Sequence, residues 1–575
     1  MIDQILRRRI LLEATAVFAG AMVFLIALAP TAPFTRELGV CESGAVRDVL
    51  AGNIILPRFI PGPMVHVPPL YWWSAALCVR VFGWTEIALR LPSMVAAALT
   101  CAMVFAWIAT TMSRRAGMWA AAALLCGHFI IDAARQPRMD SMLALFVTGA
   151  AISLERATVA GAAAPSAANR RLWFAFAALM IGLGILTKGI LGIILPGAAI
   201  GLYLVMRWRL RDLFRLELIG TFAVGLAIGL AWYAVAYTIG GRNFLEWQLN
   251  MNLWTRFIPE TVGGASYCAN PFWYFAPHTI TGFLPWSLYL PAAAVAVWPR
   301  RDRVVPEPVV YTICWFAAIF FFFSSSQGKC LVYILPAFPP LAALTGWTIS
   351  YMGEAGSERR TLLRTFKIAS VAIAIGGFVL ATAGAGTFFF GMPSPSGFPF
   401  KLHPTDLAFL EIFTAMGTQH ALSLIAWVAA SYTGSIAILL GLRRTSVTSQ
   451  ACGVLLIASA GALFWFGAMN PALAERETLA SFARQVSQTV PPGAQIGHIG
   501  IEDCDLYFYS PRPIDPVFRF RCGANPPLPR YIVIRRKRFE AMAPAARACL
   551  KPILESAPVD NAGPRLLIEQ IPPVR

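Results

Sequence analysis

Residues 324–344 read SSSQGKCLVYILPAFPPLAAL and place one lysine, Lys329, between two apolar runs. The run FAAIFFF at 316–322 precedes the serines, and a second apolar run follows the lysine. An ionisable side chain near membrane depth is costly, so it usually serves binding or catalysis. The alternative is that Lys329 reaches to the membrane surface and only marks the end of a span. The segment therefore predicts two spans joined by a polar turn, with the role of the lysine left open.

The composition is that of a polytopic membrane protein. Hydrophobic residues make up 57% of the 575 positions and charged residues only 13%, whereas a soluble domain has about 25% charged residues. The net charge is +18, but the basic residues stand in short clusters between apolar runs, as they do in cytoplasmic loops. No arginine-rich arm with interleaved aromatic residues is present, so we do not expect nucleic-acid binding.

Apolar stretches of membrane-spanning length recur along the chain. Since a span needs roughly 20 apolar residues, we predict about thirteen transmembrane helices. They are 10–29, 88–110, 116–133, 139–155, 172–187, 189–206, 216–238, 279–298, 308–325, 331–351, 366–390, 418–441 and 451–469. The first run is long and lacks a small-residue cleavage site, which favours a retained span over a signal peptide.

The basic clusters predict the orientation of these spans. If the N-terminus is cytoplasmic, the clusters all fall on one side of the membrane, as the positive-inside rule requires. Residues 30–87 then form the first outer loop of a multi-span catalytic domain, 1–472. Residues 473–575 are polar, with short β-type runs and an amphipathic helix, and indicate a small α/β domain outside the membrane. We expect this domain to lie in the outer, extracytoplasmic compartment.

Most of the 11 cysteines lie in apolar runs, as ordinary buried thiols do. In the predicted outer domain, an oxidising compartment would allow a Cys504–Cys522 bridge, although spacing alone does not establish it. No cysteine or histidine group has zinc-site spacing, and a divalent metal ion is left open as a cofactor.

Charged residues gather in the predicted outer loops and span ends. Each has an ordinary structural explanation, such as Asp140 interacting with a helix dipole. Together they suggest a site for a lipid-linked phosphate, with acids that orient or deprotonate an acceptor. The cations are Lys188, Arg256 and Lys329, and the acids are Glu37, Glu42 and Asp140.

Eight segments carry a resemblance to a known family. In order they are GNIILPRF (52–59), HVPPLYWW (66–73), FGWTEIALRLPS (82–93), PRMDSMLALF (137–146), ILTKGILGIILPG (185–197), TRFIPE (255–260), NPFWYFAPHTITGFLPW (270–286) and SSSQGKCLVYILPAFPPL (324–341). Through most of its membrane part, the chain resembles the bacterial GT-C membrane glycosyltransferases. The similar branch contains the lipid A aminoarabinose transferases and their protein O-mannosyltransferase relatives. The resemblance implies a polytopic α-helical GT-C fold of about 13 spans with a small C-terminal α/β periplasmic domain.

The resemblance also implies roles for individual residues. Counting back from the proline segments aligns the family's first acid with Glu37, whereas aligning the following short helix makes Glu42 the rival. Asp140 matches the second acid. Four further residues match positions that approach the lipid phosphate or line the cavity: Lys188, Arg256, Lys329 and Tyr333.

The chain departs from the family pattern at the phosphate. The family commonly has Glu-Lys before the two prolines, where this chain has His66 and Val67. The family's phosphate contact at this position is either lost or made by another residue, with Arg58 as a candidate. A histidine that binds metal in some relatives is Leu253 here, so that metal site is not supported.

The resemblance implies transfer of a sugar from polyprenyl (undecaprenyl) phosphate to a lipid A-type glycolipid or another envelope glycan. A protein O-glycosyltransferase of the same fold is the first alternative, and a transporter or flippase of an anionic lipid is the second. A transporter commonly has two similar halves with broken helices at the midplane, and the sequence contains no internal repeat. An inactive or polymerase-like scaffold is a third alternative, which the missing lysine at Val67 leaves open.

Overall fold

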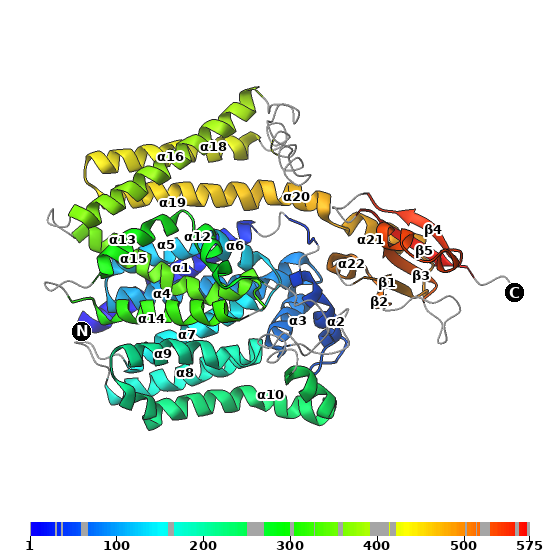
Figure 1. Ribbon diagram of the computed structural model, residues 1–575, viewed down its shortest axis with the longest axis horizontal. Helices are drawn as coiled ribbons and strands as arrows, with labels where there is room; N and C mark the ends of the chain where they lie inside the picture. The colour runs from blue at the N-terminus through cyan, green and yellow to red at the C-terminus, as the bar shows by residue number, and fades with distance from the viewer. Residues whose placement is uncertain are drawn as a thin grey trace.

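A computed structural model describes most of the chain. The described residues are 2–28, 32–35, 38–58, 67–158, 166–249, 270–298, 304–326, 328–354, 360–390, 413, 421–500, 503–512, 514–517, 529–557 and 563–571. They form a bundle of long helices and a small sheet domain that projects from one end of it (Figure 1).

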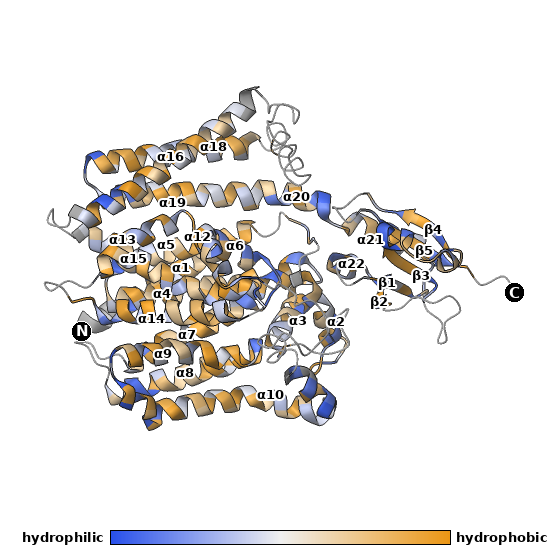
Figure 2. Ribbon diagram, in the orientation of Figure 1, coloured by the Kyte–Doolittle hydropathy of each residue, from blue (hydrophilic) through white to orange (hydrophobic). Residues whose placement is uncertain are grey.

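Long apolar helices build the bundle, and hydrophilic residues gather mainly at the ends of these helices (Figure 2). They are α1 (Ile2–Leu28), α4 (Glu86–Thr111), α8 (Ala167–Lys188), α10 (Leu216–Leu249), α14 (Glu307–Ser325), α15 (Phe338–Glu354), α16 (Arg360–Phe390), α18 (Ala421–Arg443) and α19 (Val447–Phe464). Nine described helices are long and apolar enough to cross a membrane, or eleven if each of two bent pairs is one span.

The bent pairs lie at two predicted spans. α5 (Arg114–Leu125) meets α6 (His128–Arg135) at 58°, and Phe272–Gly282, which ends in α12 (Phe275–Gly282), meets Trp286–Val297 at 104°. The second half of that pair contains α13 (Leu290–Val297). Two further predicted spans are α7 (Asp140–Thr158) and the shorter α9 (Leu191–Met206). Within the described residues, each of the thirteen predicted stretches therefore contains helix, but not each is a straight apolar span.

Helix α7 lies inside the bundle. Every residue of α7 except Arg156 is buried, and the helix packs against α4, α8 and α9. Because protein surrounds it, α7 can carry Asp140 and Glu155, which would be costly against lipid. This explains why the helix is less uniformly apolar than its neighbours.

Three short helices cover the end of the bundle that faces the sheet domain (Figure 1). They are η1 (Leu38–Cys41), α2 (Glu42–Leu50) and α3 (Leu70–Phe82). Their buried side chains join α7 and α8 in one hydrophobic cluster that includes Val46, Trp72 and Phe146. The first polar loop is thereby packed onto the ends of the helices.

The chain leaves the bundle through α20 (Asn470–Glu477), and the predicted domain boundary at 472/473 falls within this helix. The sheet has the order β2-β1-β3-β5-β4. β1 pairs in parallel with β2 and β3, and β5 pairs antiparallel with β3 and β4. The remaining elements are α21 (Ala480–Thr489), β1 (Ile496–Ile499), α22 (Cys504–Tyr509), β2 (Ile514–Pro516), β3 (Tyr531–Arg535), α23 (Arg536–Glu540), α24 (Pro544–Arg547), β4 (Leu550–Glu555) and β5 (Arg565–Gln570). The predicted α/β domain is confirmed.

A buried carboxylate joins α22 to the sheet. Asp503 Oδ1 accepts a 2.7 Å hydrogen bond from Arg565 Nη2, and Asp503 Oδ2 lies 3.3 Å from His498 Nε2. The side chains of all three residues are fully buried. Since Asp503 directly precedes α22, this network fixes the position of Cys504.

The prediction of a Cys504–Cys522 bridge is wrong. Cys504 forms a disulfide with Cys41, which precedes it by 463 residues, and the two Cα atoms are 4.8 Å apart. The reason is that α22 packs on η1, within the Cα separation that a disulfide spans. Arg47 Nη2 adds a 2.6 Å hydrogen bond to the Ser510 carbonyl. The first loop and the sheet domain are therefore covalently joined.

Candidate functional site

Two helix ends bring opposite charges together. Asp140 is the first residue of α7, and Lys188 is the last residue of α8. Gly189 ends α8 with φ 64°, a conformation that favours glycine, and its N–H bonds back to the Ile185 carbonyl. The turn thus stops α8 where its lysine reaches the start of α7.

Lys188 Nζ donates to Asp140 Oδ1 in a buried ion pair. The side chains of Lys188 and Asp140 are only 8% and 4% exposed. Low exposure strengthens the attraction and makes loss of either partner costly, since the other charge stays buried. The structure thus places two of the predicted site residues in direct contact.

Arg138 is a second cation of the site, and the sequence reasoning missed it. Its Nε donates to Asp140 Oδ2 at 3.1 Å, and Ser93 Oγ donates to its carbonyl at 2.8 Å. A Cβ at Gly39 would lie 2.5 Å from Arg138 Cγ, so only glycine lets η1 pass this close. The signal was the arginine two residues before Asp140 in PRMD.

Tyr333 lies under the lysine. Lys188 Nζ stands 4.6 Å from the centre of the Tyr333 ring, in cation–π geometry. Tyr333 belongs to η6 (Leu331–Ala337), directly after the segment that contains Lys329. The structure therefore brings the predicted residues Asp140, Lys188 and Tyr333 together.

Lys329 has backbone partners in this structure. Its Nζ donates to the Asn270 carbonyl at 2.8 Å and to the Ser326 carbonyl. The residue is 4% exposed. Its ammonium group thus ties Ser326 to Asn270, beside the segment that carries Tyr333.

Glu42 is the first-loop acid that the structure places beside the pair. Its Oε2 accepts a hydrogen bond from Trp72 Nε1, and the carboxyl interacts electrostatically with Arg138, Asp140 and Lys188. Burial raises the pKa of Glu42 to about 7. The carboxyl can therefore exchange a proton near neutral pH, as a general acid or base must. Trp72, which orients it, was another residue missed from the sequence.

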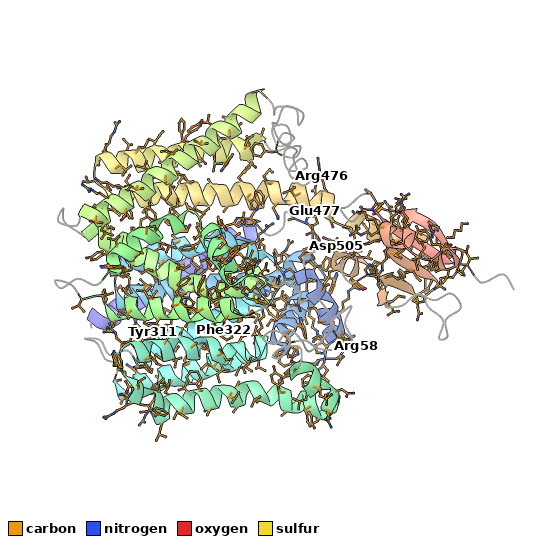
Figure 3. All side chains as sticks on the ribbon, in the orientation of Figure 1. Arg58, Tyr311, Phe322, Arg476, Glu477 and Asp505 are labelled. Atoms are coloured by element: carbon orange, nitrogen blue, oxygen red, sulfur yellow. A yellow bond between two sulfur atoms is a disulfide. The ribbon has the colours of Figure 1, made fainter. Side chains whose placement is uncertain are left out.

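The structure does not place the remaining predicted residues, Arg58, Glu37 and Arg256, in this cluster. Arg58 lies on the exposed side of the first loop (Figure 3), where its Nη2 is 3.4 Å from Asp48 Oδ1 and its N–H donates to Asp48 Oδ2. Glu37 and Arg256 lie outside the described residues. Of the two candidate first-loop acids, Glu42 therefore lies within the described residues and Glu37 does not.

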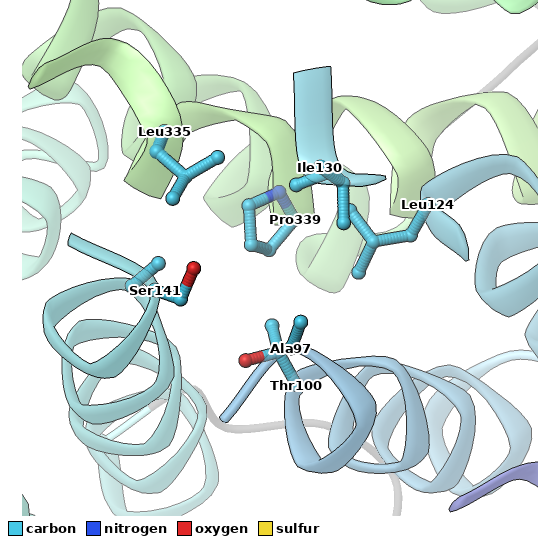
Figure 4. Close-up of a pocket in the computed structure, with 8 residues that line it drawn as sticks. Ala97, Thr100, Leu124, Ile130, Ser141, Leu335 and Pro339 are labelled. Carbon is cyan, nitrogen blue, oxygen red and sulfur yellow. The ribbon is translucent and has the colours of Figure 1, made fainter. Parts of the chain in front are cut away.

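A small apolar cavity lies next to the site (Figure 4). Ser141, which follows Asp140, points into the cavity together with Thr100 and Leu335. The volume of the cavity is about 10 Å³. That is room for about one water molecule.

Among the residues that the structure describes, no group of three His, Cys, Asp or Glu side chains could hold a metal ion. Lys188 and Arg138 can stabilise negative charge, and Glu42 can transfer a proton.

Part of the chain is similar to a known protein family. Residues 66–237 match the family described as dolichyl-phosphate-mannose-protein mannosyltransferase. This range contains Trp72, Arg138, Asp140 and Lys188.

Curated relatives extend the similarity. The undecaprenyl phosphate-alpha-4-amino-4-deoxy-L-arabinose arabinosyl transferase of Pectobacterium carotovorum subsp. carotovorum is 29% identical over 341 residues, which is 58% of this chain and 57% of that protein. The protein of the same name from Pseudomonas aeruginosa strain PAO1 is 29% identical over 300 residues, 52% of each chain. The chain thus matches little more than half the length of these relatives.

A solved structure shows the fold. ArnT from Cupriavidus metallidurans bound to undecaprenyl phosphate superimposes with a TM-score of 0.73 at 20% sequence identity, covering 96% of this chain and 97% of that one. The resemblance predicted from the sequence motifs is confirmed, and the chain has the ArnT fold.

Proposed function

We propose that this protein is a membrane glycosyltransferase that moves a sugar from undecaprenyl phosphate to lipid A. The observation that carries the proposal is the buried cluster in which Lys188 and Arg138 flank Asp140, with Glu42 beside them. The names of the matching relatives support 4-amino-4-deoxy-L-arabinose as the donor sugar.

The charges of the cluster suit a phosphate. When Glu42 is protonated, two cations face the single carboxylate of Asp140, and the cluster carries one net positive charge. Asp140 holds both cations in place, so little reorganisation is needed when charge develops on a leaving phosphate. The Tyr333 ring packs against the ammonium group of Lys188 and limits its movement.

The transfer itself is a substitution at the anomeric carbon. An oxygen of the acceptor forms a bond to that carbon, and the bond between the carbon and the donor phosphate oxygen breaks. The electron pair leaves with undecaprenyl phosphate, whose charge Lys188 and Arg138 stabilise. If the acceptor oxygen carries a proton, the ionised Glu42 takes it; an acceptor phosphate needs no base.

We infer further that the bundle lies in the bacterial inner membrane with the sheet domain in the periplasm. Disulfides persist in oxidising compartments, so the Cys41–Cys504 bond supports placing both the first loop and the sheet domain there. The distribution of basic clusters supports the same orientation.

The second candidate is transfer to a protein. The match of residues 66–237 to a protein mannosyltransferase family favours it. Both candidates share the lipid-linked donor and the cluster, and they differ only in the acceptor.

Purified protein in lipid nanodiscs tests the proposal. It is supplied with undecaprenyl phosphate-linked 4-amino-4-deoxy-L-arabinose and with either lipid A or an unfolded secreted protein. We expect one equivalent of undecaprenyl phosphate to be released per sugar that appears on lipid A. Sugar on the protein alone would favour the second candidate, and no transfer to either would contradict both.

A further inference from the structure

A second, polar cavity of about 150 Å³ lies at the end of the bundle nearest to the sheet domain. That is about ten times the least space that holds one water molecule. Elements far apart in the sequence line it: the segment after α1, α4, α6 and α20. Figure 3 labels Glu477, one of the lining residues, at the junction between the bundle and the sheet domain.

The lining combines opposite charges with neutral polar groups. Two guanidinium groups and two carboxylates balance in charge, so the cavity does not favour a free anion or cation. The hydroxyl groups of a bound molecule would both donate and accept hydrogen bonds. The lining offers them acceptors as well as donors. The polar and charged lining residues include Thr35, Arg90, Asp132, Arg135, Asn470 and Glu477.

Both arginines are held in place. Arg90 Nη2 donates to the Ala32 carbonyl at 2.8 Å, and its guanidinium lies 4.5 Å from the centre of the Phe34 ring. Arg135 donates from Nη1 to Asn470 Oδ1 at 3.0 Å. Groups fixed before binding lose little entropy when a ligand arrives. The cavity therefore has the rigidity of a binding site.

The cavity adjoins the charge cluster. Asp132 interacts electrostatically with Arg138, the residue that pairs with Asp140. Arg90 lies one helical turn before Ser93, which donates to the Arg138 carbonyl. The cavity thus lies near Arg138.

We propose that this cavity binds a sugar ring of the acceptor glycolipid and holds it beside the reacting centre. The proposal rests on the proposed function for the identity of the acceptor. A hydroxyl-rich ring matches the balanced charge and the mixed donors and acceptors better than a phosphate or an acyl chain does.

Equilibrium binding of lipid A in detergent micelles, with no sugar donor present, tests this assignment. Since Arg90 and Arg135 also hold the fold together, the variants are Glu477→Gln and Thr35→Val. Each removes one hydrogen-bonding or charged group, and we expect the Kd for lipid A to rise about tenfold. The Kd for undecaprenyl phosphate should stay unchanged. Glu475→Gln is the matched control, because Glu475 is an exposed residue of the same helix outside the cavity lining.

The outcomes separate this assignment from the proposed function. Wild-type protein that transfers sugar, with both variants binding lipid A as tightly as wild type, would overturn the cavity assignment alone. Wild-type protein that does not bind lipid A would also overturn it. Wild-type protein that binds lipid A with the expected losses in the variants, but transfers no sugar, would contradict the proposed function and leave the cavity assignment standing.

Discussion

The carboxylate of Asp140 and the ammonium group of Lys188 form a buried ion pair between the first residue of α7 and the last residue of α8. Arg138 bonds to the second carboxylate oxygen, so one acid positions two cations.

Asp140→Asn should reduce sugar transfer by about 10²–10³-fold, which is the usual effect of disturbing a group that stabilises developing charge. The amide cannot neutralise Lys188 and Arg138, and both would shift. The measurement is the initial rate of transfer in nanodiscs. Asp48→Asn is the control, because Asp48 pairs with the exposed Arg58. Equal losses in the two variants would contradict a special role for Asp140.

A double-mutant cycle with Asp140→Asn and Lys188→Met should give a coupling energy of about 1–3 kcal/mol in the free energy of unfolding. The reason is that Asp140→Asn alone leaves both Lys188 and Arg138 without their carboxylate, whereas the double variant also removes the charge of Lys188. Unfolding by denaturant in detergent provides the four stabilities. Additive effects would show that the two side chains do not interact in the membrane.

Glu42 predicts a pH dependence of transfer. Burial raises the pKa of Glu42 to about 7, so below that pH the carboxyl is mostly protonated and cannot accept a proton. If the acceptor oxygen is a hydroxyl, the rate should fall about tenfold per pH unit below 7 and level off above it. Glu42→Gln should be slow with no such slope, whereas Glu246→Gln, at an exposed residue of α10, should behave as wild type. A slope that persists in Glu42→Gln would assign the base elsewhere.

The Cys41–Cys504 disulfide should stabilise the junction between the first loop and the sheet domain. Cys504→Ser is expected to lower the free energy of unfolding by about 2–5 kcal/mol, as loss of a native disulfide does in small domains. Transfer should fall as well, because Cys41 directly precedes Glu42. Thermal melting and transfer rates provide the test, with Cys452→Ser, at an exposed free thiol, as control. Unchanged melting in Cys504→Ser would contradict this role.

The positions of the helices, and of the charged residues at their ends, could be predicted from the sequence. Hydrophobic runs located the helices, and Asp140 and Lys188 stood out because charged groups interrupt apolar runs at those points. Arg138 was missed because an arginine beside a span end has an ordinary interfacial explanation. Only the fold could reveal that its side chain turns toward Asp140.

Contacts between distant segments could not be predicted. The Cys41–Cys504 bond spans 463 residues, and no spacing rule favours it over a shorter bridge. The polar cavity combines Thr35, Arg135 and Glu477 from three separate parts of the chain. Such sites depend on how helices pack, which hydrophobic periodicity does not encode.

Transfer to lipid A in cells is tested by mass spectrometry of lipid A from a strain that lacks this protein. The strain is complemented with wild type or with Asp140→Asn. We expect lipid A to carry added 4-amino-4-deoxy-L-arabinose with wild type and to lack it in the deletion and Asp140→Asn strains. A lipid A profile that is the same in the deletion and wild-type strains would contradict lipid A as the acceptor, and full rescue by Asp140→Asn would contradict the assignment of the site.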